Sequence, residues 1–314
     1  QSIVMTIALV VVLGFGINYA GGWEQVCQNA ESLPGYLNLT STHAASSISE
    51  AIAGNLGSKP YSALTIASLL AWGLGYFGMP QVLLRFMAIR KEEELKSSRR
   101  IAMVWVVISL AVAVFIGIVG RTSAQFATTH LTAPEAESIF ITLATSSLPP
   151  ILAGFVMAGI LAATISSSDS YLLIASSAVA KNIYQGIFKK DATDKKVMNV
   201  SRITLLVITL IAMVIAWDKD SVIFNIVSFA WAGFGATFGP LMLFSLFWKR
   251  TNRVGAIAGM VSGAAMVFIW KLVISKLGGV FAIYELLPAF IFSSILIVVV
   301  SLLTKAPSKE IEED

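Results

Sequence analysis

Residues 71–80 read AWGLGYFGMP and lie in the middle of an apolar run that covers about 62–88. Three glycines and a proline weaken or break a helix, and they leave backbone carbonyls and amides without helical partners. At membrane depth such groups persist only where protein or an aqueous cavity satisfies them, and broken helices of this kind form the substrate and ion sites of secondary transporters. The stretch therefore predicts a discontinuous membrane helix, with the aromatic rings of Trp72 and Tyr76 on one face. A proline-kinked helix with glycines for close packing is the alternative.

The composition around this stretch is that of a membrane protein. The 314 residues are 56% hydrophobic and 13% charged, with a mean hydropathy of +0.80, whereas a soluble domain carries about a quarter charged residues. The two soluble domains that the length would allow are therefore excluded. Continuous apolar runs of ~20 residues favour helices over the alternating segments of a β-barrel. The roughly eight candidate spans cover about 2–20, 62–88, 101–120, 149–176, 200–217, 222–247, 254–275 and 282–304.

The basic residues cluster in alternate loops. They gather between 85 and 100, between 181 and 202, and at 249–253, whereas the loops 21–61 and 121–148 contain one each. By the positive-inside rule this pattern places both termini in the cytoplasm, as an even number of spans requires. The net charge of +4 thus reflects membrane orientation rather than nucleic-acid binding, and the end of the chain, 305–314, is predicted to be a disordered cytoplasmic tail.

The residues that would build an enzyme active site are scarce. The single cysteine, Cys27, excludes a disulfide framework, and the two histidines, His43 and His130, lie far apart in polar loops, which argues against zinc or haem. The chain contains no hydrolase, kinase or nucleotide-binding motif and no histidine within a span. An enzyme, and any organic cofactor, is therefore not expected.

A second polar stretch interrupts the fourth run, where residues 162–170 read AATISSSDS. Five hydroxyl groups and one carboxylate within seven positions are costly in hydrocarbon, which indicates a bundle interior or a cavity. Hydroxyl and carbonyl oxygens suit a hard cation such as sodium. Alternatively, the hydroxyls bond to their own helix four residues back. Asp169 either pairs with a neighbouring helix or helps to hold the cation.

Residues 230–240 read AWAGFGATFGP and repeat the features of the first motif. A second breakable helix would suggest a gate, with Trp231 and Phe234 as gating or cavity residues. Close packing through small residues explains the same pattern equally well, as it does for Gly255, Gly259 and Gly263.

These motifs carry a family resemblance. WGLGYFGMPQVLLRFMA (72–88), AGILAATISSSDSYLLIASSA (158–178) and AWAGFGATFGPLMLFSLFWKR (230–250) resemble the sodium/solute symporter family, and in particular its sodium/proline symporter branch, in the family's order and spacing. The resemblance implies an all-α, leucine-transporter-type fold of two inverted five-helix repeats, usually with thirteen spans. Here the first five spans are expected to be missing, so that the fold is incomplete. The implied parts are the fifth core helix and external loop (1–61), the second repeat (62–248), two peripheral helices (249–304) and the tail (305–314).

The resemblance also implies a function and its residues. Sodium would bind to the carbonyl of Ala163 and the hydroxyls of Ser166 and Ser167, with further ligands from the missing first core helix. The solute would bind at Trp72, Tyr76 and Pro80. The expected activity is sodium-coupled uptake of L-proline by alternating access in a bacterial inner membrane, which this segment could not perform alone. Uptake of another small amino acid or carboxylate, or a role as a passive channel or membrane scaffold, remains as an alternative.

Overall fold

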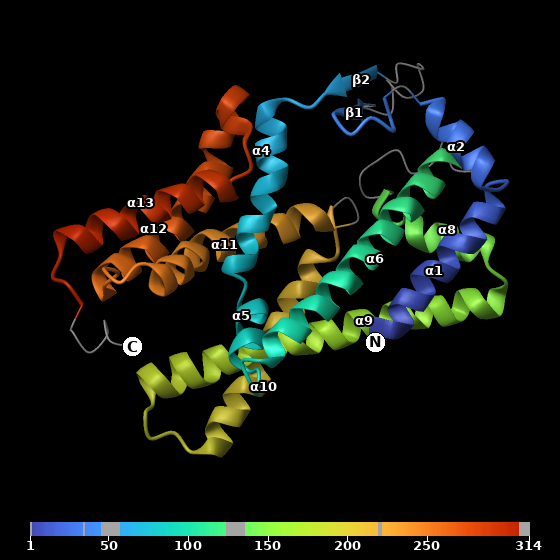
Figure 1. The fold of residues 1–314 in the computed structure, drawn as a ribbon. Coiled ribbons are helices and arrows are strands. Elements are labelled where there is room, and N and C mark those ends of the chain that lie inside the picture. Colours follow the sequence, from blue (N-terminus) through green and yellow to red (C-terminus); the bar gives the residue numbers. More distant parts are fainter. Residues whose placement is uncertain (1, 34, 45–56, 124–135, 219–221, 308–314) are drawn as a thin grey trace. The chain divides into compact units, whose positions relative to one another are not determined.

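The computed structural model describes residues 2–33, 35–44, 57–123, 136–218 and 222–307 (Figure 1). The chain divides into two compact units. The first comprises Gln1–Leu37, Ala45–Gly57 and Val104–Val222, and the second comprises Asn38–Ala44, Ser58–Met103 and Ile223–Asp314. The predicted tail continues past Pro307 into residues outside the described part, and His130 also lies outside it.

The first unit is built from long apolar helices. Its elements are α1 (Ser2–Tyr19), α2 (Trp23–Glu31), most of α6 (Glu94–Thr122), α8 (Ile139–Ser147), α9 (Pro150–Ser177), the π-helix η3 (Ala178–Phe188) and α10 (Asp194–Ile215). Fully buried Val12, Val119 and Leu143 form the centre of its core. The indole of Trp105 donates a hydrogen bond of 2.9 Å to the hydroxyl of Thr6, which ties α6 to α1.

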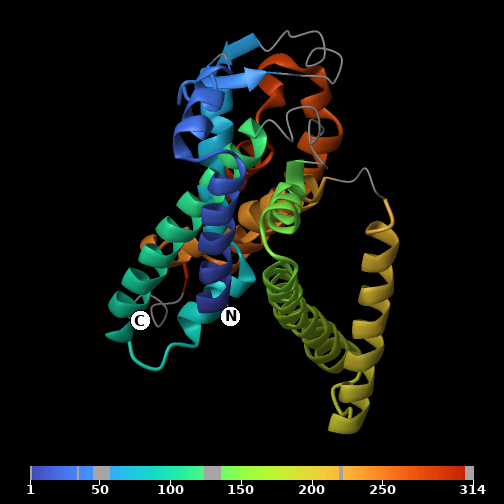
Figure 2. The ribbon, with the colours of Figure 1, turned by 90° about the vertical axis from the view of Figure 1, so that its right-hand side faces the viewer.

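Within this unit α9 and η3 form one continuous helical element. Figure 2 shows the chain leaving η3 through a sharp turn into α10, and α10 packs against both α9 and η3. The predicted run 149–176 matches α9, but the apolar pattern did not predict the π-helical extension. The short helices α2 and α8 were also missed, because each is too short to appear as a membrane-length run.

The second unit surrounds a broken helix. Its elements are β1 (Ser41–Ala44), β2 (Gly57–Pro60), α4 (Ala63–Ala71), the 3₁₀ helix η1 (Trp72–Phe77), α5 (Pro80–Met87), α11 (Ile223–Phe247), α12 (Arg253–Leu272), η4 (Ile274–Leu277), η5 (Gly279–Ala282) and α13 (Leu286–Leu303). Buried Ala232, Ala236, Val267, Leu286 and Phe290 form its core. The pair β1–β2 is a small addition to the predicted all-α architecture, which is otherwise confirmed.

Small residues let the last three helices approach closely. A Cβ added at Gly255, Gly259 or Gly263 would overlap atoms of α13 or α11, and the hydroxyl of Ser293 donates a hydrogen bond of 2.8 Å to the Gly259 carbonyl. The predicted packing role of the three glycines is therefore confirmed.

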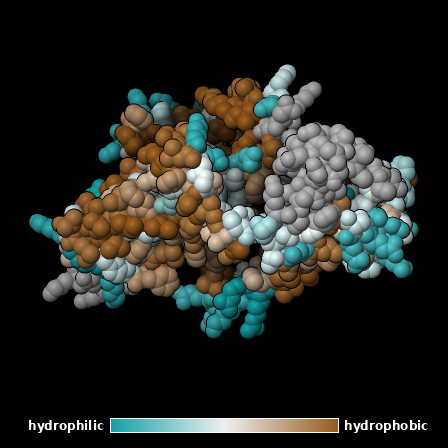
Figure 3. Space-filling model, turned by 90° about the horizontal axis from the view of Figure 1, so that it is seen from above, coloured by the Kyte–Doolittle hydropathy of each residue, from teal (hydrophilic) through white to brown (hydrophobic). Residues whose placement is uncertain are grey.

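The described helices also agree with the predicted spans. Six of them are long and apolar enough to cross a membrane, or up to eight if each of two bent helix pairs counts as one span. Large apolar side chains on these helices lie at the surface, and Figure 3 shows them gathered over α12 and α13. An apolar surface of this extent indicates contact with lipid rather than water.

Candidate functional site

The hydroxyl-rich stretch lies in the unbroken part of α9. In an α-helix a carbonyl points along the axis toward the residues three and four positions later, and those residues share its face. The structure therefore brings the carbonyl of Ala163 and the side chains of Ser166 and Ser167 onto one face of α9. Both serine side chains are exposed.

The five hydroxyls of this stretch fall into two groups. Thr164 donates a hydrogen bond of 2.9 Å to the Ile160 carbonyl, and Ser170 donates one of 3.2 Å to the Ser166 carbonyl. Bonding to the helix itself thus accounts for these two hydroxyls. Within the described part of the chain, the hydroxyls of Ser166, Ser167 and Ser168 have no hydrogen-bond partner, so they remain available as oxygen ligands.

Asp169 is exposed and forms no ion pair with any described residue. Neither of its two predicted roles is decided. The same described residues contain no group of three His, Cys, Asp or Glu side chains that could hold a metal ion, so a cation on α9 would depend on hydroxyl and carbonyl oxygens.

A separate candidate site is the broken helix of the other unit. Helix α4 ends at Ala71, η1 continues as a 3₁₀ helix, and α5 begins at Pro80 after a bend of 43°. Met79 has extended backbone angles, and the Gly78 amide donates a hydrogen bond of 3.0 Å to the Gly75 carbonyl. The predicted discontinuous helix is therefore confirmed, and half-buried Pro80 lies just beyond the bend.

Two of the three glycines of this helix, Gly75 and Gly78, face α11. A Cβ on Gly75 would overlap the indole ring of Trp231, and one on Gly78 would come within 2.9 Å of the Gly239 amide nitrogen and the Gly235 Cα. Backbone therefore packs on backbone here. The break and the close packing, which the sequence offered as alternatives, occur together.

An aromatic cluster surrounds η1. The ring of Trp72 stacks with Phe224 (centroids 5.2 Å apart), with Trp231 (5.4 Å) and with Tyr284 (6.1 Å). Tyr76, which is 52% exposed, meets Trp231 edge to face at 4.8 Å. Two of the three predicted solute-binding residues, Trp72 and Tyr76, thus both contact Trp231.

Helix α11 itself is not broken. It runs through Pro240 from Ile223 to Phe247, so the predicted second break is wrong and the packing alternative holds. Proline at 240 removes the hydrogen bond that the Ala236 carbonyl would accept. That carbonyl lies so close to Gly263 that a Cβ there could not fit.

Phe234, on the same helix, lines an apolar cavity of about 260 Å³ together with Phe229, Phe238 and Phe268. Its ring stacks on Phe238 and is 43% exposed. A cavity position is compatible with the predicted role of Phe234, whereas a gating function is not tested by this arrangement.

Tyr284 belongs to the cluster but was missed in the sequence. Its hydroxyl donates a hydrogen bond of 2.6 Å to the Ser228 carbonyl, and its amide donates one of 3.1 Å to the Ser68 hydroxyl. Burial and the neighbouring Glu285 carboxylate raise the pKa of the Tyr284 phenol. No motif marks this residue, because its partners lie 56 and 216 positions away along the chain.

The variant Tyr284→Phe is expected to lower the free energy of unfolding by about 1 kcal/mol, since it removes one partly buried hydrogen bond. A raised phenol pKa also means that folding favours the neutral form. Stability is then fully present below the ordinary pKa of ~10 and falls as the pH rises beyond it. Thermal unfolding in detergent between pH 8 and 11 should show this alkaline loss in the native protein and a smaller loss in the variant. If the native protein and the variant lost the same stability between pH 8 and 11, ionisation of Tyr284 would not be the cause of the alkaline loss.

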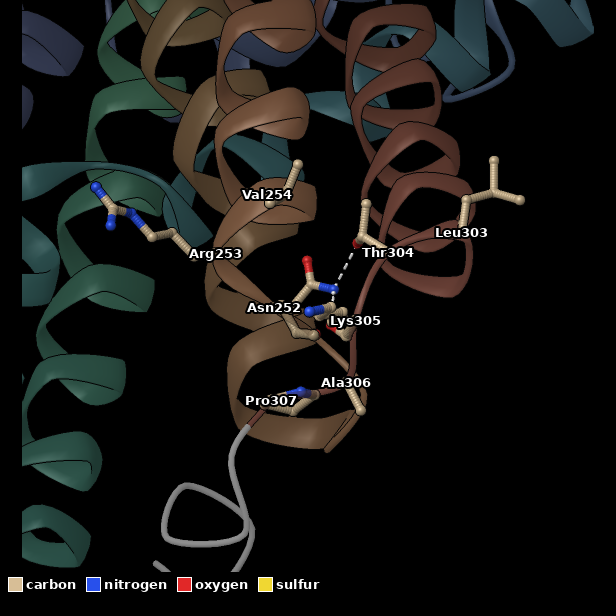
Figure 4. A pocket seen from close by; sticks show the side chains of 9 residues that line it. Asn252, Arg253, Val254, Leu303, Thr304, Lys305, Ala306 and Pro307 are labelled. Atoms are coloured by element: carbon tan, nitrogen blue, oxygen red, sulfur yellow. Dashed lines mark hydrogen bonds between the residues drawn. The ribbon is translucent and has the colours of Figure 1, made fainter.

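A larger cavity, of about 620 Å³, lies where α12 begins and α13 ends (Figure 4). Asn252 caps α12 by accepting a hydrogen bond from the Gly255 amide, and its side-chain nitrogen donates to the Thr304 hydroxyl at 2.7 Å and to the Lys305 carbonyl at 2.8 Å. These bonds hold the chain after α13 against the start of α12. Figure 4 shows the Arg253 side chain directed away from them.

Comparison with known proteins identifies the family to which the chain belongs. A sequence model of the sodium:solute symporter family matches residues 1–263. The chain is 43% identical over 255 residues to the high-affinity proline transporter PutP of Bacillus subtilis, which covers 81% of this chain and 53% of that protein. It is 44% identical over 250 residues to the sodium/proline symporter of Haemophilus influenzae, covering 79% and 50%. It is 37% identical over 320 residues to the sodium/proline symporter of Staphylococcus aureus, covering 100% and 59%.

The chain therefore spans about half the length of these curated relatives. The family match extends over both motifs of the site, the broken helix at 72–80 and the hydroxyl stretch at 162–170. Together with the apolar helices, it makes the chain an integral membrane protein. The chain belongs to the sodium:solute symporter family.

Proposed function

We propose that this chain acts in the sodium-coupled uptake of L-proline by alternating access. The observation that carries the proposal is that one chain contains both a helix face with exposed serine hydroxyls and a broken helix with aromatic side chains. The relatives, a proline transporter and two sodium/proline symporters, support proline as the solute. Another small amino acid or a small carboxylate is the alternative solute.

Sodium binds to the α9 face in this proposal. The Ala163 carbonyl and the hydroxyls of Ser166 and Ser167 supply three oxygens, and oxygen is the ligand type that hard cations take. Hard cations such as calcium take six or more ligands, so the remaining oxygens come from outside this face. The family resemblance assigns them to the first core helix. Asp169 adds negative charge within one turn of the site.

The solute binds along the broken helix. Trp72 and Tyr76 offer aromatic faces for the apolar ring of proline, and Pro80 marks the start of α5, whose N-terminal dipole end favours the solute carboxylate. Trp231 and Phe234 contribute to the gate or cavity. Sodium and solute then strengthen each other's binding by the same coupling free energy, because linkage between two sites is reciprocal.

The proposal includes location and organisation. The protein lies in a bacterial inner membrane with both ends of this segment in the cytoplasm, in keeping with the distribution of basic residues. Residues 62–248 form the second inverted repeat, residues 1–61 hold the fifth core helix and an external loop, and residues 249–304 form two peripheral helices.

The test is uptake of radiolabelled proline by the full-length protein in proteoliposomes. An inward sodium gradient should give saturable uptake at least about tenfold faster than a matched potassium gradient, since the coupling free energy of such systems is typically 1–3 kcal/mol. Unlabelled amino acids and small carboxylates, added as competitors, decide between proline and the alternative solutes. Proline flux that neither saturates nor responds to sodium would favour the passive channel instead.

A further inference from the structure

The break in the α4–η1–α5 segment leaves the shape of η1 dependent on its neighbours. A 3₁₀ helix has poorer hydrogen-bond geometry than an α-helix, and it is stable only in short pieces. Its glycines add backbone freedom. Something outside the segment must therefore hold Trp72 and Tyr76 in a defined arrangement.

Trp231 of α11 makes three contacts that hold Trp72 and Tyr76 in place. Its indole N–H donates a hydrogen bond of 3.0 Å to the carbonyl of Trp72, at the first residue of η1. Its ring stacks on the Trp72 ring with an interplanar angle of 13°, and it meets the Tyr76 ring at 83°. Half-buried Trp231 thus contacts the backbone of η1 and both predicted solute-binding rings.

The packing leaves little room for another arrangement. The Trp231 ring lies against Gly75, where no Cβ could fit. One turn farther along α11, Gly235 packs on the Gly75 Cα. The indole is therefore fixed in place by the backbone of the helix that it holds.

We propose that Trp231 is a positioning residue for solute binding. Its indole N–H holds the Trp72 carbonyl, and its ring sets the orientation of the two aromatic side chains that receive the solute. This inference rests on the proposed function and deepens it, since it assigns the affinity for the solute in part to a residue outside the broken helix.

The variant Trp231→Phe keeps an aromatic ring and loses the N–H donor. In the full-length protein we expect its apparent KM for proline to rise about three- to tenfold, which corresponds to the loss of one hydrogen bond. Vmax per inserted transporter and the half-saturating sodium concentration should stay within about twofold. A merely structural role would lower the amount of inserted transporter or Vmax without this selective rise in KM.

Trp248→Phe is the matched control. Trp248 follows α11, packs edge to face on Phe244 at 5.7 Å, and its indole donates no hydrogen bond among the described residues. The same substitution there should leave the KM for proline unchanged.

If Trp231→Phe does not reach the membrane, benzothienylalanine introduced at position 231 repeats the test, because it replaces the indole N–H by sulfur and keeps the shape of the ring. A KM equal to that of the native protein in either variant overturns the inference. Failure of the proposed function would instead be seen in the native protein, as an absence of sodium-dependent proline uptake. If the native protein transports another solute, the KM ratio is measured with that solute.

Discussion

Replacing Ser166 and Ser167 together by alanine should shift the sodium dependence of uptake by the full-length protein to much higher sodium concentrations. The double variant removes two of the three proposed sodium ligands on α9. The loss of an oxygen from a cation is expected to cost at least as much as the loss of a hydrogen bond to a charged group, about 1.5–3 kcal/mol. Two such losses raise the half-saturating sodium concentration on the order of 100-fold or more. Initial rates of proline uptake, measured from 0.1 to 500 mM sodium (roughly the range needed to follow such a shift), provide the measurement.

The matched control for this variant lies in the same stretch. Thr164 and Ser170 bond to carbonyls of their own helix, so the double variant Thr164→Ala, Ser170→Ala removes two hydroxyls that are already occupied. It should keep the sodium dependence of the native protein. Alanine has a higher helix propensity than serine or threonine, so neither double variant is expected to disturb α9. Unchanged sodium dependence in the Ser166, Ser167 variant would remove α9 from the ion site.

The second large effect is expected for Gly75→Ala. The added methyl group would occupy the position of the Trp231 ring, so either the indole or η1 must move. Overpacking of this kind costs about 1–3 kcal/mol, and the displaced indole no longer holds the Trp72 carbonyl. We expect proline uptake below about a tenth of the native rate, because the loss of 1.4 kcal/mol already corresponds to a factor of ten, together with a lower thermal unfolding temperature in detergent.

Gly73→Ala provides the comparison for that variant. Gly73 is exposed, and no atom lies within 4 Å of the position that its Cβ would take. Alanine is favoured over glycine in helices by ~1 kcal/mol, so this variant should be as stable as the native protein or more stable. Equal effects at positions 73 and 75 would show that backbone flexibility, rather than the contact with Trp231, matters in η1.

The sequence was sufficient to predict the spans because membrane helices are coded by local composition. Each run of apolar residues corresponds to a helix of the structure or to a bent helix pair. The break at 72–80 was also predictable, since glycines and proline act on the backbone at their own positions. The packing of Gly255, Gly259 and Gly263 followed from their spacing on one helix face.

What the sequence could not show depends on contacts between distant residues. The sequence left open whether Pro240 breaks α11, and in the unbroken helix the carbonyl of Ala236 lies against Gly263, 27 positions farther along the chain. The positions of Phe224 and Tyr284 beside Trp72 depend on the packing of three separate elements. For the proposed ion ligands, local spacing predicted a shared helix face. The sequence did not show that the hydroxyls of Thr164 and Ser170 bond to carbonyls of their own helix, which the structure shows.

The two candidate sites lie on helices of different continuity. The proposed solute-binding residues lie on a bent, broken helix, whereas α9 and η3 form one element from Pro150 to Phe188 with no proline after its first residue. The 28 residues of α9 alone extend over ~42 Å at 1.5 Å per residue, which exceeds the ~30 Å of the hydrocarbon core. Such an element must tilt or project into water. The exposed side chains of Lys189 and Lys190, just beyond the end of this element, suit the part that projects into water.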